Sequence, residues 1–521
     1  MDKDESKDSY GHVLKYTGIF GGVQGLNIII GLVRNKITAL LLGPAGMGLA
    51  SLLNSSVNFI SQATNLGISF SAIKHISELY DQGDTEGMER FIRIVRAWSL
   101  VAALLGMLVC IAAGPLLNSL AFSWGDHTLH FMLLSPAVAL MAITGGETAI
   151  LKATRRLRAL AVVQIWSVIA SLLISVPIYW MFRWTGIVPV IILMALATMI
   201  ITVVYSYRAY PLRLSGTKGL LGEGMEMVRL GIAFIMSGIM ASGAEMLLRA
   251  LLNAEADLDI VGLYNAGFVL TITYSGMVFS AMETDYFPRL SAVNHDNQAM
   301  KLTANRQIEV SLLIVAPMLT LLIVALPLVV PMLYSRKFTP VVPMAQIAVM
   351  SMYLRAITLP IAYMTLAKSH SKAFFVLETL SAAMQVAAVM GGYRLMGLTG
   401  TGAGLLVSYL FELALIYTYA HTRYAYRPSK GVCTYAAIHL PIGIAAYLST
   451  LIGNTLLSAC LGIMLTLTST AASLFILHKK TSLWNSLTER LKKTAQEIGT
   501  SEKHTEKNKH NGTFQQDFNI P

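Results

Sequence analysis

Apolar stretches of about 18 residues or more recur along the whole chain, separated by short segments that carry most of its charge. Such stretches are typical of membrane-spanning helices, because about 20 helical residues cross the hydrocarbon core of a bilayer. Backbone groups in lipid find no water, so each span must satisfy its own hydrogen bonds as a helix. The sequence therefore predicts an all-α polytopic membrane protein of about fourteen transmembrane helices, at residues 13–42, 46–73, 95–117, 129–151, 160–182, 186–207, 228–252, 260–286, 308–333, 341–366, 373–395, 399–420, 431–452 and 455–477.

The composition excludes several classes of protein. Only 13% of the 521 residues are charged and 55% are hydrophobic, whereas soluble domains carry about 25% charged residues. A soluble enzyme and a disordered protein are therefore excluded. Cys110, Cys433 and Cys460 lie in or beside apolar stretches without a CxxC spacing, so we expect neither a disulfide framework nor a metal site.

The distribution of Lys and Arg predicts the topology, because positive charge accumulates on the cytoplasmic side of a membrane. Of the 39 basic residues, 31 fall in the N-terminal segment, the loops after even-numbered spans and the C-terminal tail. The opposite loops hold only Arg183, Arg336, Lys337 and Arg394. We therefore expect both termini in the cytoplasm. The net charge of +11 then reflects attraction to anionic lipid rather than to nucleic acid.

An internal duplication organises the chain. At an offset of 214 residues, matching residues recur at equivalent positions of the predicted topology: Gly48-Leu49 with Gly262-Leu263, Ser77 with Ser291, Ala153 with Ala367, Arg158-Ala159 with Lys372-Ala373, and Thr185-Gly186 with Thr399-Gly400. Two six-helix lobes with an even number of spans insert in the same direction, so we expect a parallel repeat with a pseudo-two-fold axis along the membrane normal. Two lobes around a cleft suit alternating access.

The predicted organisation has six parts. They are a charged N-terminal segment at 1–12, an N-lobe at 13–207, a cytoplasmic linker at 208–227, a C-lobe at 228–420, an appended helix pair at 421–477 and a polar cytoplasmic tail at 478–521.

Signatures of catalysis are missing from the sequence. The motifs GxxxxGK[ST], HExxH and GxSxG do not occur, and no long polar loop offers paired acids. The run Gly400-Thr401-Gly402-Ala403-Gly404 opens an apolar span, where small residues favour close helix packing over nucleotide binding. We expect a transporter rather than an enzyme, with no cofactor.

Charged residues inside the predicted spans are the candidate site residues, because each costs about 2.5–3.5 kcal/mol to insert and usually faces a cavity or a partner. The cations are Arg34, Lys36, Arg249 and Arg355. Arg34 and Arg249 lie fourteen and thirteen residues before the repeated Gly48 and Gly262, so each lobe places an arginine near the outer end of its first helix. Such a pair in a cleft would bind a phosphate or pyrophosphate; the alternative is that both side chains extend to the outer interface.

Lys36 points about 200° away from Arg34 around the helix, so the two cannot line one face. Among the acids, Glu245 precedes Arg249 by four residues, the favourable order for a helix ion pair, and Glu412 lies near the middle of its span. We expect Glu245 or Glu412 to act in ion coupling. Glu147 and Glu378, near the ends of their spans, are expected to pair with basic residues of neighbouring loops.

Three segments resemble a known family. They are GLVRNKITALLLGPAGMGLASLLNSSVNFISQATNLGIS (31–69), AIKHISELYDQGD (72–84) and AILKATRRLRALAVVQ (149–164). The chain resembles bacterial polysaccharide flippases of the multidrug/oligosaccharidyl-lipid/polysaccharide exporter superfamily. Within it, the stretch LGPAGMGLA (42–50) is most similar to O-antigen and enterobacterial common antigen translocases.

The resemblance implies that the protein flips an undecaprenyl-pyrophosphate-linked oligosaccharide from the cytoplasmic to the periplasmic leaflet of the bacterial inner membrane. It implies a V-shaped pair of lobes around a cationic cavity, with the lipid-linked oligosaccharide and membrane lipids as partners, together with the polymerase and chain-length machinery of the same glycan pathway. The alternatives are a drug or metabolite cation antiporter of the same superfamily, a peptidoglycan-precursor flippase and a membrane glycan polymerase.

Overall fold

The computed structural model describes residues 3–121, 126–212 and 220–480, which are helical apart from short connections. The first half contains α1 (Lys3–Thr64), α2 (Ile68–Gln82), α3 (Thr85–Ala121), α4 (Thr128–Leu133), α5 (Ser135–Ala153), α6 (Leu157–Phe182), η1 (Arg183–Gly186) and α7 (Ile187–Ala209). The second half contains α8 (Leu220–Glu223), α9 (Met225–Glu255), α10 (Leu258–Phe268), the π-helix η2 (Val269–Thr273), α11 (Tyr274–Ala292), α12 (Asn297–Leu333), η3 (Arg336–Val341), α13 (Val342–Ala367), α14 (Ser371–Tyr424), α15 (Lys430–Thr450) and α16 (Thr455–Lys480).

Eleven helical segments of the described chain are long and apolar enough to cross a membrane, and three of them contain a break. The breaks lie at Gly43 in α1, at η1 between α6 and α7, and at Gly397 in α14. Gly43 and Gly397 have φ of 67° and 60°, a conformation that glycine adopts without the strain a Cβ would cause. Each break separates two lengths of membrane helix, so the chain is a multi-pass membrane protein and the prediction of fourteen membrane helices is confirmed.

One predicted span is wrong in detail. The span at 46–73 stops early, because α1 ends at Thr64 and Gly67, with φ of 68°, turns the chain into α2. A Cβ at Gly67 would lie 2.0 Å from the backbone of Gly231, so α9 crosses here in direct backbone contact. The span predicted at 260–286 is present, with the π-helix η2 between α10 and α11.

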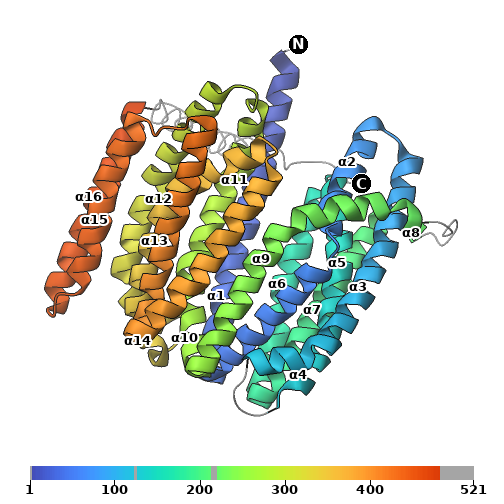
Figure 1. Cartoon of the computed structure of the whole chain (residues 1–521), viewed down its shortest axis with the longest axis horizontal. Helices are drawn as coiled ribbons and strands as arrows, with labels where there is room; N and C mark the ends of the chain where they lie inside the picture. The colour runs from blue at the N-terminus through green and yellow to red at the C-terminus, as the bar shows by residue number, and fades with distance from the viewer. Residues whose placement is uncertain (1–2, 122–125, 213–219, 481–521) are drawn as a thin grey trace, which may run out of the picture.

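Two lobes stand side by side (Figure 1), with α1 to α7 on one side and α10 to α14 on the other. The long α9 runs from α8, beside α3, across α2 and α1 to the lower edge of the view, where α10 begins. The pair α15 and α16 packs on α12 at the outer edge of the second lobe. The residue boundaries of the lobes stay a prediction, and the tail from 481 lies outside the described residues.

The lobes meet tightly at the lower edge of Figure 1, where α1 crosses α10. A Cβ at Gly48 would lie 2.0 Å from the Leu258 carbonyl oxygen, and one at Gly262 would lie 1.9 Å from the Pro44 carbonyl oxygen. Gly48 and Gly262 are the residues that the 214-residue offset pairs. Because residues related by a two-fold axis meet where the axis passes between them, this crossing marks the pseudo-two-fold axis.

Small residues also allow close packing in the second lobe. A Cβ at Gly402 would lie 2.3 Å from the Met344 carbonyl oxygen, and one at Gly404 would lie 2.3 Å from that of Ala388. The prediction that the run 400–404 serves helix packing is confirmed.

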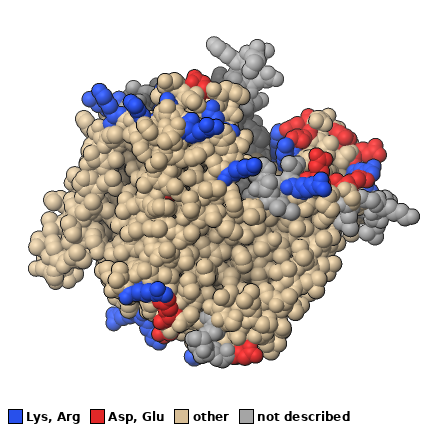
Figure 2. All heavy atoms as spheres, viewed as in Figure 1, with Lys and Arg blue, Asp and Glu red and all other residues tan. Residues whose placement is uncertain are grey.

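Charged side chains occupy the two ends of the molecule (Figure 2), and an uncharged band separates them. Most of the visible Lys and Arg gather along the upper edge, which we call the basic face. At this face the connecting helix α8 is held to α3, because Arg90 donates two hydrogen bonds of 3.0 and 2.6 Å to the Glu223 carboxylate. These hydrogen bonds hold the pKa of Glu223 below its ordinary value.

Replacing Gly262 with alanine should lower the thermal stability of the detergent-purified protein. Alanine inside a helix normally stabilises the folded protein by about 1 kcal/mol relative to glycine. Here, however, its methyl group would collide with backbone atoms of α1. The matched control is Gly391→Ala, whose Cβ meets no atom within 4 Å. If Gly262→Ala unfolds at the same temperature as Gly391→Ala and the unaltered protein, or at a higher one, the crossing does not hold the lobes together.

Candidate functional site: a polar cavity between the lobes

A cavity of about 1220 Å³ opens among α1, α5, α6, α7 and α9. It extends from Lys152, which lies near the end of α5 at the basic face, to Arg249, six residues before the end of α9 at the opposite face. Most of its lining comes from residues 34 to 198; α9 and α10 contribute Gly238, Ala241, Ser242, Glu245, Arg249 and Asn265. The cavity is therefore hollowed into the first lobe and bounded by the beginning of the second.

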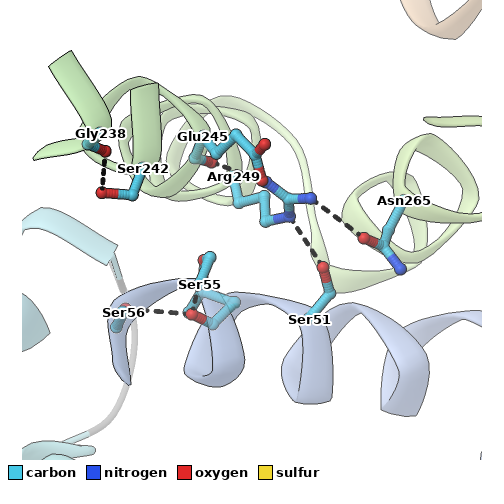
Figure 3. A network of polar contacts seen from close by, with 9 residues as sticks. Ser51, Ser55, Ser56, Gly238, Ser242, Glu245, Arg249 and Asn265 are labelled. Atoms are coloured by element: carbon cyan, nitrogen blue, oxygen red, sulfur yellow. Dashed lines mark hydrogen bonds and ion pairs between the residues drawn. The ribbon is translucent and has the colours of Figure 1, made fainter. Parts of the chain in front are cut away.

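Arg249 joins three helices in one polar network (Figure 3). Its Nε donates to Ser51 Oγ at 2.8 Å and its Nη2 donates to Asn265 Oδ1 at 3.2 Å, so the guanidinium connects α9 with α1 and α10. Its Nη1 donates to the carbonyl oxygen of Glu245 at 2.9 Å and to the carboxylate of the same residue at 3.3 Å. The guanidinium also lies 5.6 Å from the centre of the Phe268 ring.

The two members of this ion pair differ in exposure. The Arg249 side chain is 7% exposed, whereas that of Glu245 is 47% exposed and faces the cavity. Most N–H donors of Arg249 are thus hydrogen-bonded within the protein. Removing a buried arginine from such a network lowers stability, because its partners lose their hydrogen bonds. The predicted helix pair is present, and Arg249 fixes the contact between the lobes as well as lining the cavity.

Arg34 lies in the same cavity with fewer partners. Its Nη1 approaches Ser171 Oγ of α6 at 3.4 Å, and the hydroxyls of Tyr179 and Tyr274 lie nearby. Among the described residues, no carboxylate pairs with its guanidinium, and a guanidinium carries five N–H donors. Arg34 is therefore the lining cation with the most donors available to a ligand. The structure places it in the cavity rather than at the outer interface.

The other two predicted cleft cations lie elsewhere. Lys36 points away from the cavity, as its place on the helix requires, and its Nζ donates to the carbonyl oxygen of Pro331 at 3.0 Å. That carbonyl is among the last four of α12, which have no partner within their own helix. Arg355 on α13 donates to the Tyr409 hydroxyl at 3.1 Å and is absent from the cavity lining. Neither residue joins Arg34 and Arg249.

The predicted acidic residues likewise lie in different parts of the molecule, and not all of them line the cavity. Glu412 on α14 interacts electrostatically with Arg355 and Glu378, within the second lobe and away from the cavity lining. Glu147 is buried near the basic face, where it accepts hydrogen bonds from Arg96 at 2.9 Å and from Ser206 at 2.5 Å. Only Glu245 brings a carboxylate to the described lining of the cavity.

The sequence analysis missed a stripe of uncharged polar residues, which we call the amide stripe. It runs along the second length of α1 and into α2 and comprises Ser51, Asn54, Ser55, Asn58, Ser61, Gln62, Asn65 and Ser69, all of which line the cavity. The spacing of Asn54, Asn58 and Gln62 at every fourth position of a predicted membrane span is the signal that predicts a polar helix face.

The residues that line the cavity carry a net positive charge and also include neutral hydrogen-bonding groups. Three cations, Arg34, Lys152 and Arg249, face one carboxylate, Glu245, and the described lining includes one aromatic side chain, Tyr179. Arginines bind phosphate oxygens through charge-assisted hydrogen bonds, and amides and hydroxyls match sugar hydroxyls as donors and acceptors. Chemically, the cavity suits a ligand with an anionic group attached to an uncharged polar group.

Comparison with known families gives one match. The profile of a family described as polysaccharide biosynthesis protein matches residues 37–343, well over half of the chain. This match covers both the amide stripe and Arg249. No curated protein sequence is significantly similar to the chain.

Solved structures share the fold at low sequence identity. An inward-facing multidrug resistance transporter of the MATE family, in the MOP superfamily, has a TM-score of 0.66 at 14% identity, covering 77% of this chain and 94% of its own. The lipid II flippase MurJ in an inward closed conformation has a TM-score of 0.64 at 14% identity, covering 87% of this chain and 98% of its own. A MOP superfamily transporter from Pyrococcus furiosus has a TM-score of 0.57 at 13% identity, covering 79% and 96%. The predicted two-lobe fold is confirmed.

Proposed function

The chain belongs to the polysaccharide biosynthesis protein family, and we propose that it flips an undecaprenyl-pyrophosphate-linked oligosaccharide, such as an O-antigen repeat unit, across the inner membrane. One observation carries the proposal: Arg34 faces a polar cavity without a carboxylate partner among the described residues. A half-buried cation of this kind requires an anion or water, and a pyrophosphate supplies the anion. The match to a polysaccharide biosynthesis family and the fold shared with a lipid II flippase support a substrate of this class.

The physical task explains the need for a cavity. A sugar headgroup that crossed about 30 Å of hydrocarbon unaided would lose the water bound to its hydroxyls without replacement. In our proposal, the headgroup enters the cavity and exchanges water for the arginines and the amide stripe, while the isoprenoid tail stays in the bilayer. The tail then follows the headgroup to the other leaflet.

The direction of transport follows from the basic face. Lysines and arginines accumulate on the cytoplasmic side of membrane proteins, so we assign the basic face, and with it both termini, to the cytoplasm of a bacterium. The cavity has Lys152 at that face, whereas the crossing of Gly48 and Gly262 closes the opposite one. This conformation would load substrate from the cytoplasmic leaflet. Rocking of the lobes about the crossing would then release it to the periplasmic leaflet, where the polymerase of the pathway takes it.

The rival functions fit the cavity less well. A transporter of cationic drugs needs acids or aromatic rings to hold its substrate, and the described lining offers Glu245, which already pairs with Arg249, and Tyr179. A membrane glycan polymerase would place acids or a histidine where the glycan is held, and the stripe in this cavity is uncharged. We therefore favour the flippase.

Replacing Arg34 with alanine should reduce transport by about tenfold to a hundredfold, the usual effect of losing hydrogen bonds to a charged group. The assay reconstitutes the full-length protein in vesicles and follows the movement of an undecaprenyl-pyrophosphate-linked oligosaccharide between leaflets. Lys36→Ala is the matched control, because it removes a cation two residues away that does not line the cavity. The double variant Arg34→Ala with Arg249→Ala should abolish export of the glycan in cells.

The thermal stability of each variant separates binding from folding. Because Arg249 holds α9, α1 and α10 together, Arg249→Ala should also lower the unfolding temperature, whereas Arg34→Ala should leave it nearly unchanged. Unaltered transport in the Arg34→Ala protein, or an equal loss in Lys36→Ala, would refute the cationic role of Arg34.

We further propose that Glu245 or Glu412 couples transport to an ion gradient. Glu245 is half exposed in the cavity, where solvent ions reach it, and Glu412 lies within the electrostatic reach of Arg355 in the second lobe. Changing both to glutamine keeps their size and one acceptor oxygen but removes the charge. Transport by the double variant should lose its dependence on a proton or sodium gradient across the vesicle membrane. An unchanged rate with an unchanged gradient dependence excludes both residues.

A further inference from the structure

The amide stripe contains side chains that the protein itself does not satisfy. Asn54 donates to the Ala50 carbonyl oxygen at 2.8 Å and Asn65 donates to Ser69 at 3.1 Å. Among the described residues, the side chains of Asn58, Ser61 and Gln62 have no hydrogen-bond partner. They occupy consecutive positions of one helix face at the centre of the stripe, and Asn58 and Gln62 are exposed to the cavity.

Comparison within the chain indicates that these amides are not required by the fold. At the 214-residue offset, Asn54, Asn58 and Asn65 correspond to Phe268, Ile272 and Phe279, and Gln62 corresponds to Gly276, whereas Ser61 corresponds to Ser275. Phe268 and Phe279 belong to the hydrophobic core of the second lobe, and Ile272 packs against that core. The duplicated helix thus forms without an amide at any of the four equivalent positions.

The difference between the lobes has a physical cost. An amide exposed inside a membrane span is unfavourable unless water or a ligand satisfies it, and the same helix face in the second lobe avoids this cost by burying aromatic and aliphatic side chains. The polar residues therefore serve something that enters the cavity of the first lobe. Because the stripe is uncharged, that group is neutral and rich in hydroxyls or amides.

From these observations we propose that Asn58, Ser61 and Gln62 bind the sugar portion of the transported lipid, so that the first lobe alone selects the glycan. This inference rests on the proposed flippase function and assigns separate tasks within the cavity. Arg34 binds the pyrophosphate that every such lipid carries, whereas the three polar side chains distinguish a lipid with a glycan from one without. They are specificity-determining residues.

The test measures binding of two defined probes to the full-length purified protein: undecaprenyl pyrophosphate, and the same lipid with one linked N-acetylhexosamine. The variant Asn58→Leu with Gln62→Leu keeps similar side-chain volumes and removes both amides. It should bind the sugar-bearing lipid about tenfold to thirtyfold more weakly, the effect of losing one or two net hydrogen bonds. Its affinity for undecaprenyl pyrophosphate should stay within about twofold of the unaltered protein.

Two comparisons control for folding and for anion binding. The exchange Asn58→Gln with Gln62→Asn keeps an amide at each position and should retain most of the preference for the sugar-bearing lipid. Arg34→Ala should weaken both probes to a similar degree, since both carry the pyrophosphate. Equal unfolding temperatures of the leucine and amide-exchange variants establish that both proteins are folded.

Each other outcome overturns the inference in a recognisable way. If the leucine variant binds both probes normally, the amide stripe does not recognise sugar, although the flippase function stands. If it loses both probes equally, these side chains shape the cavity or hold the pyrophosphate instead. If the unaltered protein binds neither lipid, the proposed function itself is wrong and the inference falls with it.

Discussion

The hydrocarbon core of a membrane leaves every polar group dependent on a partner within the protein or on water that the protein admits. Nearly all of this structure follows that constraint. The backbone is helical, Lys36 satisfies a carbonyl at the end of α12, and Glu147 is matched by Arg96 and Ser206. The cavity departs from this pattern, because Arg34 and the centre of the amide stripe are left for a ligand or water.

The duplication explains how one chain combines a firm scaffold with such an opening. Gly48 and Gly262 come from equivalent places in the two lobes and meet at the pseudo-two-fold axis, where neither tolerates a Cβ. Around that symmetric contact the lobes have diverged. The second lobe has one continuous hydrophobic core, whereas the core of the first is divided into two clusters and its helices line the cavity. In the proposed mechanism, the contact supplies the hinge region and the divergence supplies the site.

The sequence predicted the membrane helices well, because length and hydropathy are local properties of a span. The breaks at Gly43 and Gly397 fall between predicted spans, as does η1. The turn at Gly67 was missed, because its cause is the approach of Gly231, which is 164 residues away and has no local signature. Tertiary packing likewise decided which charged residues share the cavity. The periodicity of the helix separated Lys36 from Arg34, but no pattern in the sequence placed Arg355 with Tyr409 instead of with Arg249. The amide stripe, in contrast, could have been predicted from the spacing of Asn54, Asn58 and Gln62 and from the lack of amides at the positions 214 residues later.

The central claim is that water reaches a polar face of α1 within the membrane. Labelling of single cysteines in native membranes tests it most directly, with Cys110, Cys433 and Cys460 replaced. Asn58→Cys should react with a membrane-impermeant thiol reagent, whereas Leu108→Cys, on the outer face of α3 where the side chain is 66% exposed, should resist that reagent and contact lipid-soluble quenchers. A residue 58 that resists the reagent and is quenched from the lipid would contradict the account.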